Sequence, residues 1–139
     1  MRSPLRTAAA SFLALLAFAA AADAAAQAAA SAPVPAIKRT LLQRTDIAPD
    51  REVILGIAEI PPGLAAGRHT HFGLETGYVI EGSASLEVEG EMPRLLKAGD
   101  SYTIPAGKVH DAKTVGDKPV KVLATYVVEK GKPLATPAP

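Results

Sequence analysis

Short apolar segments that alternate with polar residues and end at glycine or proline constrain the fold of this chain most strongly. In the segment 83–89, Ala84, Leu86 and Val88 alternate with polar or charged residues. This period of two predicts a half-buried β-strand. Further apolar or β-branched segments are 53–60, 76–80, 101–104, 109–115 and 120–128. Many short strands separated by turn signals predict an all-β fold, an antiparallel sandwich or barrel.

The first 26 residues are predicted to be a cleaved signal peptide. Arg2 and Arg6 precede an uncharged stretch over 8–22, and small residues at Ala22-Asp23-Ala24 and Ala24-Ala25-Ala26 offer cleavage sites. The apolar run is shorter than the roughly 20 residues of a membrane-spanning helix. A retained membrane anchor is the alternative. We expect a periplasmic or secreted protein with no membrane association after cleavage.

Composition divides the remaining chain into three parts. Residues 27–37 are rich in Ala, Ser and Pro and predict a flexible leader, and 131–139 predict a flexible tail. Residues 38–130 are expected to form one folded domain, because a chain of this length builds a single core.

Charge and cysteine content exclude several classes of function. Without the signal peptide the chain has as many basic as acidic residues, so it has no electrostatic footprint for nucleic acid. The chain has no cysteine, which excludes disulfides, thiolate metal sites and a cysteine nucleophile. The expected partner is a small molecule.

The chain has three histidines, and two of them are separated by one residue in His69-Thr70-His71. On a strand, residues i and i+2 point to the same face, so both imidazoles could enter one interior. Glu75 follows after a glycine-containing interruption. Alone, this pattern is a weak signal of a metal site.

The positions of several glycines, one proline and the histidines together form two longer motifs. The first runs from Gly63 through His69, His71 and Glu75 to Gly82, and the second from Gly99 through Pro105 and Gly107 to His110. In these motifs the chain resembles the cupin superfamily, in particular the small single-domain bacterial cupins.

The resemblance implies an antiparallel double-sheet jelly-roll β-barrel with one metal site. His69, His71, Glu75 and His110 would be the metal ligands, and Glu75 could also act as a base. Three imidazoles and one carboxylate suit a divalent transition metal, with Fe, Mn, Ni, Cu, Co and Zn all open. The family's second motif usually continues to an asparagine where this chain has Thr114. That residue is not normally a ligand, so the change puts pocket detail in doubt and leaves the metal site intact.

Three functions remain open after this comparison. The first is a metal-dependent enzyme acting on a small organic molecule, resembling the dioxygenase cupins. The second is a non-catalytic periplasmic module that binds or senses a metal or small ligand, and the third is a metal-assisted isomerase or lyase. A homodimer is expected, because small cupins often pair through an edge strand.

Overall fold

The computed structural model describes residues 36–139. The predicted signal peptide and most of the predicted leader lie outside the described residues. All regular structure over 36–139 is β-strand, and no helix in this part of the chain has the length and hydrophobicity to cross a membrane. The all-β prediction is therefore confirmed.

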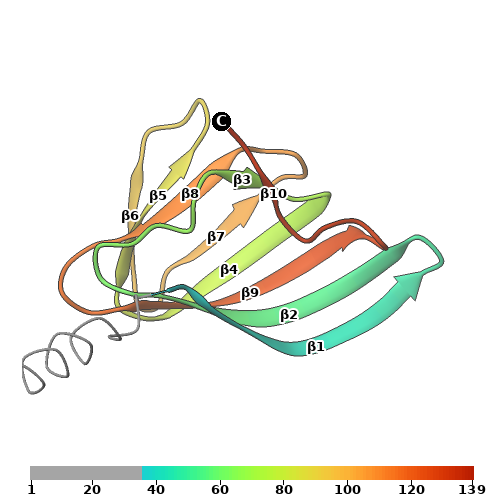
Figure 1. Cartoon of the computed structure of the whole chain (residues 1–139), viewed down its shortest axis with the longest axis horizontal. Helices are drawn as coiled ribbons and strands as arrows, with labels where there is room; N and C mark the ends of the chain where they lie inside the picture. Colours follow the sequence, from blue (N-terminus) through green and yellow to red (C-terminus); the bar gives the residue numbers. More distant parts are fainter. Residues whose placement is uncertain (1–35) are drawn as a thin grey trace, which may run out of the picture. The chain divides into compact units, whose positions relative to one another are not determined.

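Ten strands form two antiparallel sheets, as in a jelly roll (Figure 1). Sheet A contains, in spatial order, β1 (Lys38–Ala48), β2 (Arg51–Ile60), β9 (Val120–Glu129), β4 (Gly73–Glu81) and β7 (Ser101–Ile104). Sheet B contains β10 (Thr136–Pro137), β3 (His69–Thr70), β8 (His110–Thr114), β5 (Ser83–Val88) and β6 (Arg94–Lys97).

The hydrophobic core lies between the sheets, where the inward residues of each strand meet. In β5, Ala84, Leu86 and Val88 are all buried, as the alternation predicts. From sheet A, Val79 and Val120 are fully buried in the same cluster. Alternate residues share a face, so the same periodicity that builds this core also directs side chains of β4 and β8 into the barrel.

The structure adds β1, β3 and β6 to the strands predicted from the sequence. The sequence analysis did not predict β1 or β6 as strands. The whole of β1 is exposed except its last residue, and its pairing with β2 is interrupted by two register shifts, so it lacks a buried alternating face. β6 is only four residues long and has one buried position. β3 contains only His69 and Thr70 and ends before His71.

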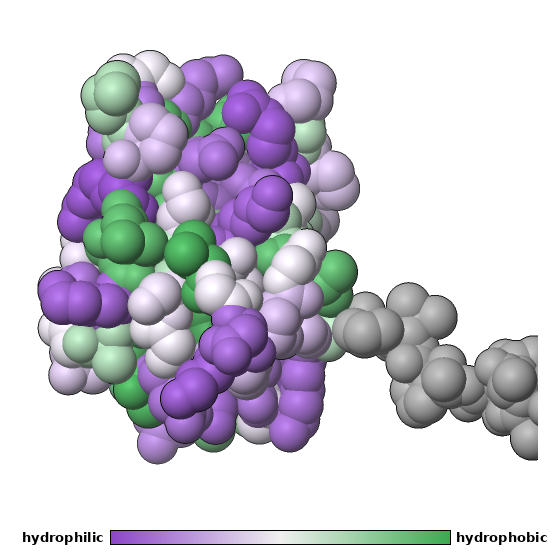
Figure 2. All heavy atoms as spheres, turned by 90° about the vertical axis from the view of Figure 1, so that its left-hand side faces the viewer, coloured by the Kyte–Doolittle hydropathy of each residue, from purple (hydrophilic) through white to green (hydrophobic). Residues whose placement is uncertain are grey.

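The outer surface is mixed in character. On the face that Figure 2 shows, hydrophobic residues lie between hydrophilic ones. Some large apolar side chains are nevertheless exposed, including Leu41 and Ile47 on β1. β1 lies at one end of sheet A and also carries the basic residues Lys38, Arg39 and Arg44.

Candidate metal centre and its pocket

Both sheets contribute to one cluster of four side chains. In sheet B, β3 and β8 pair so that His69 lies directly opposite His110. His71 follows β3, and β4 of sheet A supplies Glu75. The structure thus brings together all four residues that the sequence singled out, and each can offer one ligand atom such that all these atoms lie within 4.8 Å of one another.

The imidazole rings are close and their outer nitrogens are already bonded. Nδ1 of His69 lies 2.6 Å from the carbonyl oxygen of Gly67, and Nδ1 of His110 lies 3.0 Å from that of Lys108. Nδ1 of His71 lies 2.5 Å from the carbonyl oxygen of Leu134. A carbonyl only accepts, so each Nδ1 carries the proton and donates it. In a neutral ring, Nε2 then has a free lone pair, which is what metal binding requires.

The nitrogen and oxygen atoms at the centre of the cluster are arranged as ligands of a shared cation. Nε2 of His71 lies 2.7 Å from Oε2 of Glu75, is buried and makes no hydrogen bond. Nε2 of His110 lies 3.1 Å from the same oxygen. The Nε2 lone pairs and the Glu75 carboxylate face one point, so they repel one another unless a positive charge lies between them. These four residues could therefore hold a divalent transition metal, and the donor set does not identify which one.

The protonation equilibria reflect burial and the negative charge of Glu75. Burial raises the pKa of Glu75, but without a metal, hydrogen bonds from the imidazoles of His110 and His71 in their Nε2-protonated form outweigh burial and bring this pKa down to about 2. Burial lowers the pKa of His69. In His110 burial also acts downward, but the Glu75 carboxylate outweighs it and raises the pKa. Glu75 is thus ionised at neutral pH, as a ligand must be.

Tyr102 holds the carboxylate in place, a role that the sequence analysis missed. Its hydroxyl donates a hydrogen bond of 2.8 Å to Oε1 of Glu75, while Oε2 faces the imidazoles. The Tyr102 ring lies over Gly77, its register partner in β4, where a Cβ would come within 2.2 Å of the ring. No tyrosine was singled out from the sequence. The signal was a glycine two residues after Glu75, which is informative only once β4 and β7 are known to be paired.

The C-terminal segment also contributes to the site, and part of the predicted tail over 131–139 forms a strand. Thr136–Pro137 form β10, which pairs with the free edge of β3. This pairing places the carbonyl oxygen of Leu134 against Nδ1 of His71. The tail is ordered because it satisfies a strand edge and a buried imidazole that would otherwise lack partners.

Thr114 shares the buried face of β8 with His110, as strand parity predicts. Its hydroxyl donates a hydrogen bond of 2.9 Å to the carbonyl oxygen of Ile60. Thr114 therefore ties β8 to the end of β2. This chain therefore uses the position of the family's asparagine for a structural contact between two strands.

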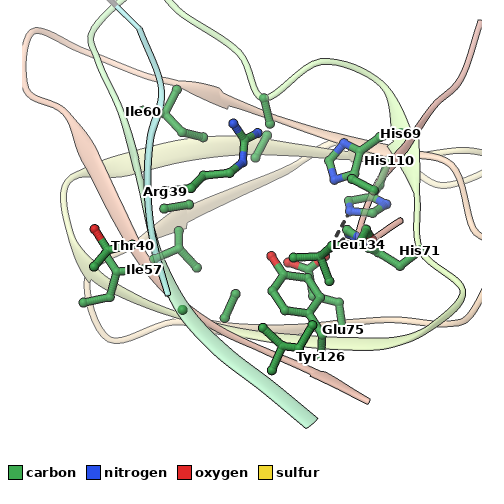
Figure 3. A pocket seen from close by; sticks show the side chains of 18 of the residues that line it. Arg39, Thr40, Ile57, Ile60, His69, His71, Glu75, His110, Tyr126 and Leu134 are labelled. Carbon is green, nitrogen blue, oxygen red and sulfur yellow. Dashed lines mark hydrogen bonds and ion pairs between the residues drawn. The ribbon is translucent and has the colours of Figure 1, made fainter. Parts of the chain in front are cut away.

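A pocket of about 350 Å³ opens beside the four side chains. Figure 3 shows the histidines, Glu75 and Tyr126 on its inner side and Arg39 extending into it from β1. Tyr126 lies against the His71 ring, with 4.9 Å between ring centroids. Most of the remaining wall is apolar, and the volume is typical of a site for a small organic molecule.

The comparisons with known proteins agree with this architecture. The Cupin_2 family, described as a cupin domain, matches residues 56–126, just over half of the chain. The chain is a member of the cupin family. The prediction of a small cupin-type domain is thereby confirmed.

Among its relatives, this cupin is 38% identical over 72 residues to dimethylsulfoniopropionate lyase DddW of Ruegeria pomeroyi, covering 52% of this chain and 46% of the relative. It is similar in structure to the lyase DddQ of the same species, with a TM-score of 0.56 and 26% identity over 62% of this chain and 43% of that one. The cupin spans less than half the length of either lyase.

A third similar structure is an uncharacterised protein of Klebsiella pneumoniae with a double-stranded β-helix domain. It has a TM-score of 0.57 and 26% identity, and the match covers 76% of this cupin and 90% of that chain. The match thus spans most of that chain, unlike the matches to the two lyases.

The contact between the tail and His71 predicts that a variant ending at Lys132 binds metal about 10-fold more weakly, because loss of a group that orients a ligand costs roughly 10–100-fold. The measurement is competition for Zn²⁺ against a chromophoric chelator. Leu134→Ala keeps the backbone carbonyl and is the control, expected to bind near wild-type affinity. Equal affinity of the truncated and full-length proteins would show that the tail does not position His71.

Proposed function

We propose that this cupin is a metal-dependent lyase that acts on a small organic molecule. The observation that carries the proposal is the convergence of three imidazoles and Glu75 at the inner side of an otherwise apolar pocket. The relatives named as dimethylsulfoniopropionate lyases support a lyase over the other enzyme classes. A bound metal would act as a Lewis acid on substrate oxygen atoms and favour loss of a neighbouring proton.

The residues of the pocket suggest how the proton is moved. Glu75 is a weak base, because its pKa is about 2, which favours a ligand over the additional role of base. Burial and the Glu75 carboxylate raise the pKa of both Tyr102 and Tyr126, so both phenols are neutral at physiological pH. Tyr102 is bonded to Glu75, whereas Tyr126 has no side-chain partner among residues 36–139. We assign proton transfer to Tyr126: once its hydroxyl proton is released to solvent, which the positive charges of Arg39 and a bound metal would favour, the phenolate would accept the substrate proton.

Tyr126→Phe is expected to lower turnover by about 100-fold or more, since a positioned acid or base contributes roughly 10²–10⁴-fold. Metal content should stay at the wild-type level, because Tyr126 is not one of the four clustered residues. The assay follows consumption of dimethylsulfoniopropionate by metal-reconstituted protein. Tyr78→Phe is the matched control, because Tyr78 is half exposed on β4.

The same assay separates the other predicted functions. Oxygen consumption with flavonols, diketones or thiols, together with no lyase turnover, would instead support the dioxygenase-like enzyme. Metal binding with no turnover of any substrate would support the non-catalytic binding or sensing module. An unchanged rate in Tyr126→Phe would contradict the role given to this phenol.

Export and dimer formation complete the proposal. We propose that residues 1–26 direct export to the periplasm or beyond, on the sequence pattern alone. We propose a homodimer that pairs through β1, because β1 is an end strand of sheet A and exposes Leu41 and Ile47.

A further inference from the structure

Arg39 brings a positive charge to the pocket. Its side chain extends from β1 toward the side on which the histidines lie (Figure 3), and it lines the pocket together with them. The charge of Arg39 also acts to lower the pKa of Tyr126, opposing burial and Glu75, which act to raise it. Arg39 and the candidate metal centre therefore face the same cavity.

Arg39 differs from the other basic residues of β1 because no carboxylate among residues 36–139 pairs with it. Nε of Arg44 lies 3.2 Å from Glu52, and Nζ of Lys38 lies 3.4 Å from Glu59. The guanidinium of Arg39 makes no ion pair or hydrogen bond within the described part of the chain. A planar guanidinium presents paired donors that match a carboxylate, so this one is free to bind an anion from solution.

Most of the remaining pocket wall is apolar. Ile54, Ile57, Ile60, Leu86 and Val122 contribute to it. No second unpaired arginine or lysine lines the pocket, since Arg44 is held by Glu52. One guanidinium suits a single carboxylate better than a polyphosphate, and a cavity of about 350 Å³ excludes polymers.

We infer that Arg39 binds the carboxylate of a small organic acid whose apolar portion fills the pocket and whose other end reaches the four clustered side chains. As a statement about the substrate, this inference rests on the proposed lyase function. It names the substrate class as a carboxylic acid that reacts at a position away from the carboxylate bound by Arg39. Arg39 would thereby fix which carbon atom lies beside Tyr126 and the metal.

The test uses metal-free protein and an unreactive probe, so that it does not depend on turnover. Pentanoate and its neutral analogue pentanamide are titrated at millimolar concentrations and followed by amide chemical shifts. The titration is run at about pH 8, where the carboxyl group of pentanoate is fully ionised. Wild-type protein is expected to bind pentanoate in preference to pentanamide.

Arg39→Gln should weaken pentanoate binding about 10-fold and leave pentanamide binding unchanged, because a charge-assisted hydrogen-bonded pair is lost. Lys38→Gln removes the same charge from the adjacent position of β1, where the side chain pairs with Glu59, and should bind pentanoate as wild type does. Arg39→Lys keeps the charge without the paired donors, so its affinity for pentanoate should lie between those of Arg39→Gln and wild type.

Three results would overturn the inference: equal pentanoate affinity in Arg39→Gln and wild type, equal binding of pentanamide and pentanoate, or no binding of pentanoate by the wild type. Failure of lyase turnover alone would leave these affinities unchanged. The outcome therefore separates the carboxylate site from the proposed reaction.

Discussion

Replacement of His71 by alanine is expected to lower the affinity of this cupin for Zn²⁺ or Ni²⁺ by more than about 100-fold. His71 is 3% exposed, its Nδ1 is held by Leu134, and its Nε2 is aimed at the carboxylate of Glu75. Loss of a group that only orients a ligand costs roughly 10–100-fold, so loss of a ligand itself costs more. The proposed lyase turnover should be lost together with the metal.

Because His71 is buried, its truncation also leaves a cavity that lowers the free energy of unfolding. Glu75→Gln is therefore the second variant, since it removes the charge and keeps the shape and the hydrogen bond from Tyr102. Thr76→Ala, on the outward face of β4, is the control and should bind metal as wild type does. The affinities are measured by chelator competition, and folding is checked by circular dichroism. Wild-type affinity in both site variants would rule out a metal centre at this cluster.

The second large effect is expected at Gly82, where β4 of sheet A leads into β5 of sheet B. Gly82→Ala should lower the free energy of unfolding by about 3 kcal/mol or more, the sum of backbone strain and overpacking. Gly82 has a φ of 76°, in the left-handed region. A Cβ there would lie 2.3 Å from the carbonyl oxygen of Pro119 and 2.9 Å from Cα of Val120. Both are backbone atoms, so the contact is not relieved by rotating a side chain.

Gly63 is a matched control for the backbone conformation alone. Its φ is 75°, but a Cβ at this position would meet no atom within 4 Å. Gly63→Ala should therefore cost only about 1–2 kcal/mol, the strain of a left-handed residue. The measurement is urea unfolding of both variants beside the wild type. Equal destabilisation would show that the close approach to Pro119 contributes nothing.

Strands with a clear period of two were predictable from the sequence. Residues 101–104 form β7 within the predicted bounds, and β5, β8 and β9 agree with their predicted segments to within one or two residues. β1 was not predictable from the sequence, because both of its faces are exposed and its register shifts disturb the alternation. Local patterns predict strands only where one face is buried.

The candidate ligands were also predictable, because the chain carries the two motifs by which it resembles the cupin superfamily, and the resemblance implies these four ligands. The residues that support the ligands were not. Tyr102 reaches Glu75 from 27 positions away, and the Leu134 carbonyl reaches His71 from 63 positions away. Backbone carbonyls are identical in every residue, so no residue type marks Leu134 as a partner.

The sequence by itself determined the fold class, the four candidate ligands and the exclusion of disulfide and thiolate chemistry. Only the tertiary structure decided that the tail is ordered against β3, that Tyr102 holds Glu75, and that Arg39 faces the same pocket as the histidines. The physical reason is that periodicity and motif spacing are local properties of a chain. Sheet order and strand register are set by burial over the whole domain, and they decide which distant side chains meet.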